Sequence, residues 1–207
     1  MDNMHLILFI CIATPLSMML FVFRERARAI LGFLLAGIFM CLFAGEINGL
    51  IRNAGGLSER FLTVNLTPVV EEILKALPVV FIAFVVKPEQ RFLLEGAVAV
   101  GVGFATMENT CLLFDSAASL SAATIIARGF GAGMMHGVST LAVGYSLTMV
   151  GNRRKLSYSG TVGALSVAII YHSIYNVMVQ SAYPLLGILL PLVTFIPLSL
   201  AVNYKKR

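Results

Sequence analysis

Seven apolar stretches of about 20 residues follow one another along this 207-residue chain, with only short polar segments between them. A stretch of this length crosses the hydrocarbon core of a bilayer as a helix, which satisfies its own backbone hydrogen bonds. The pattern therefore predicts an all-α, polytopic membrane helix bundle that forms a single domain over residues 1–207. We expect a loop or a short interfacial helix at 116–127. The expected spans are 4–23, 29–51, 62–86, 93–114, 128–150, 157–180 and 184–203.

The composition excludes a soluble globular domain. Hydrophobic residues make up 58% of the chain and charged residues 12%, and the mean hydropathy is +0.91. The net charge of +5 does not indicate nucleic-acid binding, because the basic residues lie at span ends, where they face lipid headgroups. Cys11, Cys41 and Cys111 have spacings that match neither a zinc knuckle nor a disulfide framework, so we expect buried free thiols.

The basic residues also predict how the chain is oriented. Of the 15 Lys and Arg residues, 11 follow the first, third, fifth and seventh spans. The positive-inside rule then places the amino terminus outside and the carboxyl terminus in the cytoplasm, as expected for a multi-pass protein of the plasma membrane. Residues 1–23 are expected to be an uncleaved span, because their basic cluster comes after the apolar run. The 11 residues are Arg24, Arg26, Arg28, Lys87, Arg91, Arg153, Arg154, Lys155, Lys205, Lys206 and Arg207.

Three ionisable residues interrupt the third span, in the stretch TPVVEEILKALPVV at 67–80. Each mid-span charge costs about 2.5–3.5 kcal/mol of insertion free energy, so Glu71, Glu72 and Lys75 together cost about 8–10 kcal/mol. Lys75 lies four residues after Glu71 and three after Glu72, so it can neutralise one carboxylate and leave the other as a candidate general base. The alternative is a salt bridge on a solvated helix face, which the apolar flanks disfavour.

Polar residues of three later spans are predicted to lie at the same depth as these glutamates. Glu108 and Asn109 fall in the fourth span, His136 in the fifth, and His172 in the sixth with Asn176 one turn further on. Counted from the outer span ends at 1.5 Å per residue, the acidic and histidine side chains lie about 9–15 Å into the membrane. Any one buried histidine is more often a satisfied core residue, but the common depth predicts one shared site nearer the outer face.

Glycines in the fifth span are expected to bring His136 close to its neighbours. Gly129, Gly133 and Gly137 recur every four residues, the small-residue spacing that lets membrane helices approach closely. The same stretch, GFGAG, is not a nucleotide-binding motif, because no strand precedes it.

Four motifs, EEILK, GFATMEN, MHGVST and YHSIYN, occur in the order and span positions of the PrsW family between residues 66 and 180. The chain therefore resembles the bacterial intramembrane proteases that make the first cut in membrane-anchored anti-sigma factors. The wider superfamily includes the CAAX prenyl endopeptidases and the scaffold subunit of gamma-secretase. Prenyl endopeptidases typically show EExxxR and FxxxH, whereas this chain has EExxK and places Phe104 four residues before Glu108, so PrsW is the better match.

This resemblance implies a peptide-hydrolysing site. The residues with implied catalytic roles are Glu71, Glu72, Glu108, His172 and Asn176, and those with orienting roles are Lys75, Phe104, Asn109 and His136. In a metal-independent mechanism, glutamates activate the water while His172 and Asn176 stabilise the oxyanion. In a metal-dependent mechanism, Zn²⁺ is held by two histidines and one or two glutamates, and a spare glutamate is the base. The candidate ligands are then Glu72, Glu108, His136 and His172.

Two other classes of function stay open. A proton- or ion-coupled transporter or channel also places Glu, Lys and His at mid-membrane, although the two halves show no internal repeat. A non-catalytic membrane scaffold is the third alternative. For a protease, the expected partners are the bilayer and a single-span substrate resembling an anti-sigma factor, cut near the extracytoplasmic end of its span, with no nucleic acid. Glu46 and Asn48, near the outer end of the second span, belong either to the polar site or to its edge.

Overall fold

The computed structural model of the chain describes residues 3–116, 122–150, 154–181 and 185–204. Within these residues the fold is entirely helical, so the predicted all-α membrane bundle is confirmed. Seven helices have 17–29 residues, and a three-residue helix and a π-helical turn precede the third of them, α4. The elements are α1 Asn3–Met19, α2 Glu25–Asn53, α3 Glu59–Phe61, η1 Leu62–Leu66, α4 Thr67–Val85, α5 Gln90–Ser116, α6 Ala122–Val150, α7 Arg154–Val179 and α8 Leu186–Tyr204.

Three of the described helices are long and apolar enough to cross a membrane: α2, Gln90–Asp115 of α5 and Ser159–Val179 of α7. Shorter apolar helices cover Met4–Met19 and Leu186–Leu200. The 19 residues of α4 include three charges, so its composition does not identify it as a span. The number of seven spans and their orientation stay predictions.

The observed helices differ from the predicted spans by up to six residues at their ends. α1 ends at Met19, four residues before the expected end, and α6 begins at Ala122, six residues before the expected start. The segment 116–127 is therefore divided between the end of α5 and the first turn of α6, and 117–121 lie outside the described residues. The cysteines are free as expected, but none of them is buried: Cys11 is exposed on α1, and Cys41 and Cys111 are half-buried.

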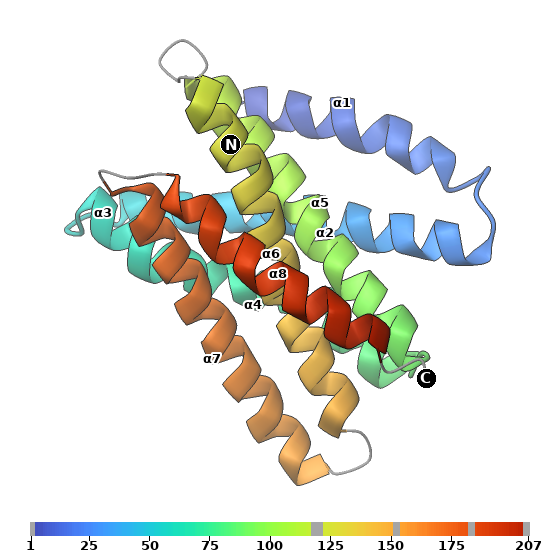
Figure 1. The fold of residues 1–207 in the computed structure, drawn as a ribbon. Helices are drawn as coiled ribbons and strands as arrows, with labels where there is room; N and C mark the ends of the chain where they lie inside the picture. Colours follow the sequence, from blue (N-terminus) through green and yellow to red (C-terminus); the bar gives the residue numbers. More distant parts are fainter. Residues whose placement is uncertain (1–2, 117–121, 151–153, 182–184, 205–207) are drawn as a thin grey trace.

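Glycines let α2, α5 and α6 approach one another closely (Figure 1). A Cβ atom at Gly37 of α2 would overlap the Val100 carbonyl oxygen of α5, and one at Gly101 of α5 would overlap the His136 carbonyl oxygen of α6. The expectation for the fifth span holds only at Gly137, whose Cα would be 2.9 Å from a Cβ built at Gly101 of α5. No described atom lies within 4 Å of a Cβ built at Gly129 or Gly133. The glycine that packs against His136 belongs to α5.

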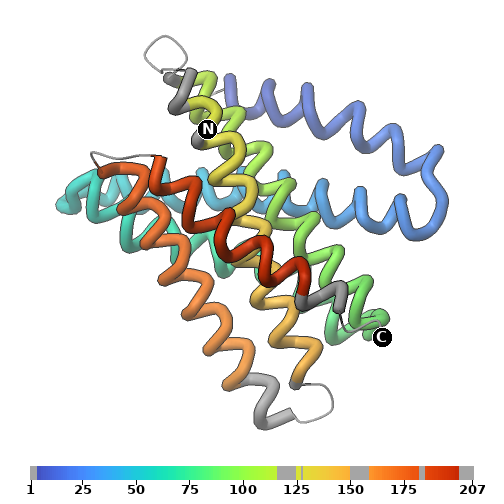
Figure 2. Tube along the Cα trace, viewed as in Figure 1, coloured from blue at the N-terminus to red at the C-terminus, as the bar shows by residue number. Residues whose placement is uncertain are grey.

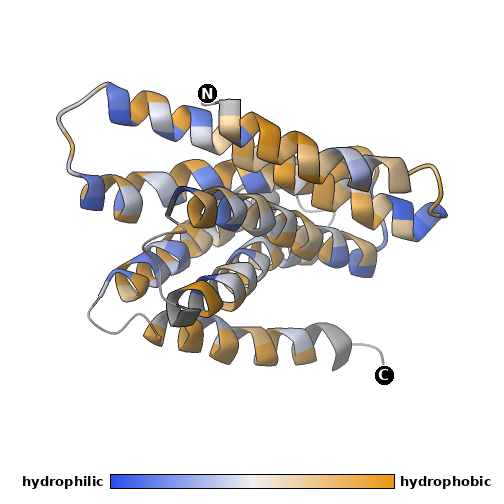
Figure 3. Ribbon diagram, turned by 90° about the horizontal axis from the view of Figure 1, so that it is seen from above, coloured by the Kyte–Doolittle hydropathy of each residue, from blue (hydrophilic) through white to orange (hydrophobic). Residues whose placement is uncertain are grey.

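Successive long helices run in alternating directions through the bundle (Figure 2). The end of α1, the start of α2, the end of α4 and the start of α5 therefore lie toward one end of it, at the right in Figure 1. Hydrophobic residues occur along all the long helices (Figure 3), and large apolar side chains such as Phe81, Val167 and Ile170 are about 60% exposed. This surface suits lipid better than water.

Candidate active site

The inward face of α4 carries the charged residues that the sequence singles out. Glu72, Lys75 and Val79 follow helical spacing and are at most 1% exposed, and Glu71 beside them is 5% exposed. Phe81, on the outward side, is 60% exposed. Because the charges point into the bundle and the apolar side chains point outward, α4 can lie in a membrane despite its composition.

Lys75 is the centre of a buried polar network. Its Nζ donates to Glu72 Oε1 at 2.5 Å, to His136 Nδ1 at 2.6 Å and to Ser139 Oγ at 3.3 Å. These three contacts match the three N–H donors of an ammonium group. The charge is therefore paired and fully hydrogen-bonded, as a buried charge must be to be tolerated.

The Lys75 contact determines which nitrogen of His136 carries the proton. An ammonium group only donates, so His136 Nδ1 accepts and the ring proton of the neutral imidazole is on Nε2. That N–H donates to Glu108 Oε2 at 2.7 Å. The Phe104 ring packs beside this group, with its centroid 5.2 Å from both the His136 ring and Lys75 Nζ. Phe104 is thus within contact distance of both groups.

His172 lies between the two neighbouring glutamates of α4. Its Nδ1 is 2.8 Å from Glu72 Oε1, and its Nε2 is 3.7 Å from Glu71 Oε2. Glu72 Oε1 already accepts from Lys75, so it is anionic and takes the Nδ1 proton of His172 as a hydrogen bond. The Nε2 lone pair then faces Glu71. Histidines that bind metals typically hydrogen-bond to a carboxylate through one ring nitrogen and leave the other ring nitrogen free for the metal.

Glu71, His136 and His172 form a group that fits a metal ion. One donor atom from each lies within 4.8 Å of the other two, and all three residues are buried. Glu71 Oε2 is buried and has no hydrogen-bond donor among the described residues, which is costly for a carboxylate unless it has a ligand. Two imidazoles and one carboxylate with an open position are the ligand set of several catalytic zinc sites.

This group differs from the four ligands suggested by the sequence. It keeps His136 and His172 but contains Glu71 instead of Glu72 and Glu108. Glu72 Oε1 is on the Nδ1 side of His172 and is occupied by hydrogen bonds from Lys75 and Ser139 as well. Glu108 is bonded to His136 and lies 3.5 Å from Arg128 Nη2.

A cavity of about 600 Å³ leads to this group from one end of the bundle. Glu71 and Glu108 line it, whereas His136 and His172 do not and are at most 2% exposed. Glu46 and Asn48 line the same cavity. The other lining residues are His5, Cys41, Leu42, Gly45, Gly49, Leu50, Arg52, Asn53, Met107, Cys111, Leu112 and Asp115.

Two residues singled out by the sequence lie outside the network. The Asn176 amide donates to the Thr63 carbonyl oxygen at 2.9 Å and so holds η1 against α7. The Asn109 amide donates to the Arg128 carbonyl oxygen at 3.3 Å, which ties α5 to α6. Both amides thus bind backbone rather than the carboxylates or histidines.

Two further residues of the site, Ser139 and Arg128, were not among those predicted from the sequence. Ser139 Oγ lies 3.2 Å from Glu72 Oε1 and adds a hydroxyl to the network. Its position three residues after His136 puts both on one helix face, which was the available signal. Arg128, on α6, has its guanidinium within ion-pair distance of Glu108.

The comparisons with known proteins agree with this geometry. A family model described as "PrsW family intramembrane metalloprotease" matches residues 15–202, nearly the whole chain. No curated protein and no solved structure matches the chain. With its buried glutamate and histidine group inside a helical membrane bundle, the chain belongs to the PrsW family of intramembrane metalloproteases.

Proposed function

We propose that this protein cuts a single-span membrane protein near the extracytoplasmic end of its span, as the first cut in an anti-sigma factor. The observation that carries the proposal is the cavity that connects Glu71 and Glu108 to one end of the bundle. Peptide hydrolysis within a membrane needs water and room for an unwound substrate backbone, and a polar cavity of about 600 Å³ supplies both. Family membership favours proteolysis over the transporter, channel and scaffold alternatives.

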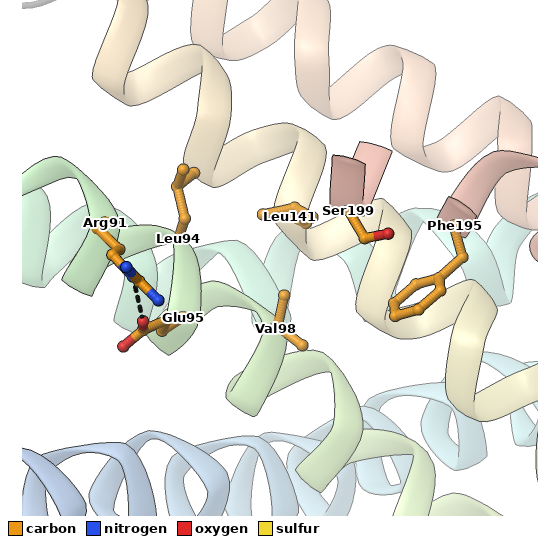
Figure 4. Close-up of a pocket in the computed structure, with 7 residues that line it drawn as sticks. All are labelled: Arg91, Leu94, Glu95, Val98, Leu141, Phe195 and Ser199. Atoms are coloured by element: carbon orange, nitrogen blue, oxygen red, sulfur yellow. Dashed lines mark hydrogen bonds and ion pairs between the residues drawn. The ribbon is translucent and has the colours of Figure 1, made fainter. Parts of the chain in front are cut away.

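The opposite end of the bundle supports the proposed orientation. Arg26 at the start of α2 and Arg91 at the start of α5 both bind Glu95, at 2.6 and 2.9 Å. Figure 4 shows Arg91 and Glu95 in a pocket that also includes Phe195 and Ser199 of α8. Basic residues from two connections thus meet at one end, as the positive-inside rule expects of the cytoplasmic side of the plasma membrane. The cavity then opens on the extracytoplasmic side.

Glu71, His136 and His172 would hold the metal ion, and we propose that it is Zn²⁺ because the set contains two imidazoles and one carboxylate. When bound, such an ion polarises a carbonyl group and acidifies water. Whichever nitrogen of His136 binds a cation must give up its present partner, Lys75 on Nδ1 or Glu108 on Nε2. The family description supports the metal-dependent mechanism of the two that the sequence left open.

Glu108 is the general base in this proposal. Its side chain is 21% exposed and lines the cavity. A carboxylate in this position can take a proton from the attacking water as the water oxygen bonds to the scissile carbonyl carbon. It can return the proton to the amide nitrogen as the carbon–nitrogen bond breaks.

Glu72 and Lys75 act as positioning residues in this account. Glu72 holds His172 through Nδ1, and Lys75 holds His136 through Nδ1. Because the two are joined by their own 2.5 Å contact, the two histidines are fixed relative to one another. Asn176 acts at longer range, by fixing η1 and with it the start of α4.

The experiment reconstitutes the purified protein in vesicles with a tagged single-span anti-sigma factor. We expect two products, with the mass-determined cut at or just outside the extracytoplasmic end of the substrate's span. A chelator should stop the cleavage, and added Zn²⁺ should restore it. A cut in the cytoplasmic half of the span would contradict the proposed orientation. If the protein cleaves none of the anti-sigma factors tested, the proposed substrate class is contradicted.

A further inference from the structure

A row of small residues on α2 is packed at one end and uncovered at the other. Gly37, Cys41, Gly45 and Gly49 recur every four residues along this helix. At Gly37 the backbone of α5 is so close that a Cβ atom would overlap the Val100 carbonyl oxygen. At Gly45 and Gly49 no described atom lies within 4 Å of such a Cβ. The surface that packs tightly on α5 thus continues without a covering helix.

The uncovered part of this row leads to the candidate active site. Cys41, Gly45 and Gly49 line the same cavity as Glu71 and Glu108. A second observation indicates that the cavity leads to a ligand-binding group: Glu71 is 5% exposed, and its Oε2 has no hydrogen-bond donor among the described residues. The uncovered glycines of α2 and Glu71, whose carboxylate has an unpaired oxygen, therefore line the same cavity.

We propose that the uncovered surface around Gly45 and Gly49 binds the membrane span of the substrate and directs its scissile bond toward Glu71 and Glu108. Small residues at four-residue spacing let a second backbone approach closely in a membrane, as the packing at Gly37 already demonstrates. This inference rests on the proposed function, because the occupant is the substrate of that reaction. It adds the residues that recognise the substrate.

The lining of the cavity favours a polypeptide over a lipid chain. Alongside the glycines it presents Asn48, Arg52 and Asn53 on α2 and the carboxylates of Glu71 and Glu108. An acyl chain has no group that could hydrogen-bond to them, and covering a polar group without a partner costs about 1–3 kcal/mol. A partly unwound peptide backbone brings its own N–H and C=O groups to such a surface.

The first test fills the surface with a larger side chain. We expect Gly45→Leu and Gly49→Leu to lower cleavage of reconstituted, tagged single-span anti-sigma factors at least tenfold, with metal content and melting temperature unchanged. The matched control is Gly32→Leu, because Gly32 also lies on α2, would have no described atom within 4 Å of an added Cβ and is absent from the cavity lining. Leucine is a better helix former than glycine, so all three variants should fold.

The second test locates the substrate without requiring cleavage. In a Glu108→Gln background with Cys41→Ser and Cys111→Ser, which removes both free cysteines of the cavity lining, Gly49→Cys should form a disulfide with a cysteine placed beside the scissile bond, and Gly32→Cys should not. Wild-type cleavage rates in both leucine variants, or equal cross-linking at positions 49 and 32, would overturn the docking surface. A phospholipid found at the cavity by native mass spectrometry, without substrate cross-linking, would also overturn it. If the wild type cleaves no member of the panel, the proposed function itself fails.

Discussion

Two glutamates of this protein have two basic partners each, but in very different surroundings. Glu95 pairs with Arg26 and Arg91 at one end of the bundle, and all three side chains are 33–53% exposed. Glu72 pairs with Lys75 and His172 in the interior, where all three are at most 2% exposed. Exposed pairs contribute about 0–1 kcal/mol, whereas breaking a buried pair costs about 3–5 kcal/mol. Similar pairing thus has a minor structural effect at one end and fixes the site in the interior.

The largest effect should come from removing the carboxylate that faces the cavity. Glu108→Gln keeps a side chain of the same shape but cannot accept a proton, so we expect cleavage to fall about 10²–10⁴-fold. Metal content should stay at the wild-type level, because Glu108 is not one of the three grouped donors. Product formation and metal analysis on one preparation check both parts, and a variant with more than a tenth of wild-type activity would remove Glu108 from the role of base.

Breaking the interior pair should cost stability as well as activity. Lys75→Met leaves Glu72 Oε1 without its cation and His136 Nδ1 without its donor, so we expect a loss of about 3–5 kcal/mol in the free energy of unfolding. Adding Glu72→Gln should recover much of the stability, because it removes the unpaired carboxylate, but not the cleavage, because His172 then loses its anionic partner. Thermal unfolding in detergent measures the first effect. If Lys75→Met unfolds like the wild type, the network does not stabilise the interior as inferred.

A smaller effect is expected from one hydroxyl of the interior network. Ser139→Ala removes a group 3.2 Å from Glu72 Oε1 and should cost about 0.5–1.5 kcal/mol, with a several-fold loss of cleavage. Ser166→Ala is the control, because Ser166 bonds the Val162 carbonyl oxygen on an exposed part of α7. Equal effects of the two substitutions on cleavage would mean that Ser139 has no special place in the site.

The smallest effect should come from the exposed pair. Glu95→Gln removes the shared partner of Arg26 and Arg91, but we expect a change within about 1 kcal/mol and cleavage at the wild-type rate. The same unfolding and cleavage assays apply. A loss as large as that of Lys75→Met would show that exposure does not separate the two regions.

The fold was more predictable from the sequence than the details of the site. Apolar length and helix geometry predict the long helices, and the charges in α4 predict a polar interior, because both depend on local composition. The roles of Glu71 and Glu72 could not be separated in this way, since they are adjacent on one helix. What distinguishes them is the side of the His172 ring on which each lies, which depends on the packing of α7 against α4.

Asn176 and the glycines show the same limit. The motif placed Asn176 one turn from His172, but its amide reaches Thr63 because η1 lies against α7. The four-residue glycine spacing in α6 suggested close packing there, whereas the close approach to His136 comes from Gly101 of α5. A spacing indicates that a helix can be approached closely, but only the tertiary arrangement determines which neighbour does so.

The most direct test of the account measures the bound metal and the cleavage activity of the Glu71→Gln variant. The wild type and the Glu95→Gln variant are measured beside it for comparison. Purified and loaded with Zn²⁺, the wild type and Glu95→Gln should retain about one ion per chain and cleave the anti-sigma factor, since Glu95 lies outside the metal group. Glu71→Gln should lose both while remaining folded, because it removes the only carboxylate of that group. Full metal retention and cleavage in Glu71→Gln would contradict the account.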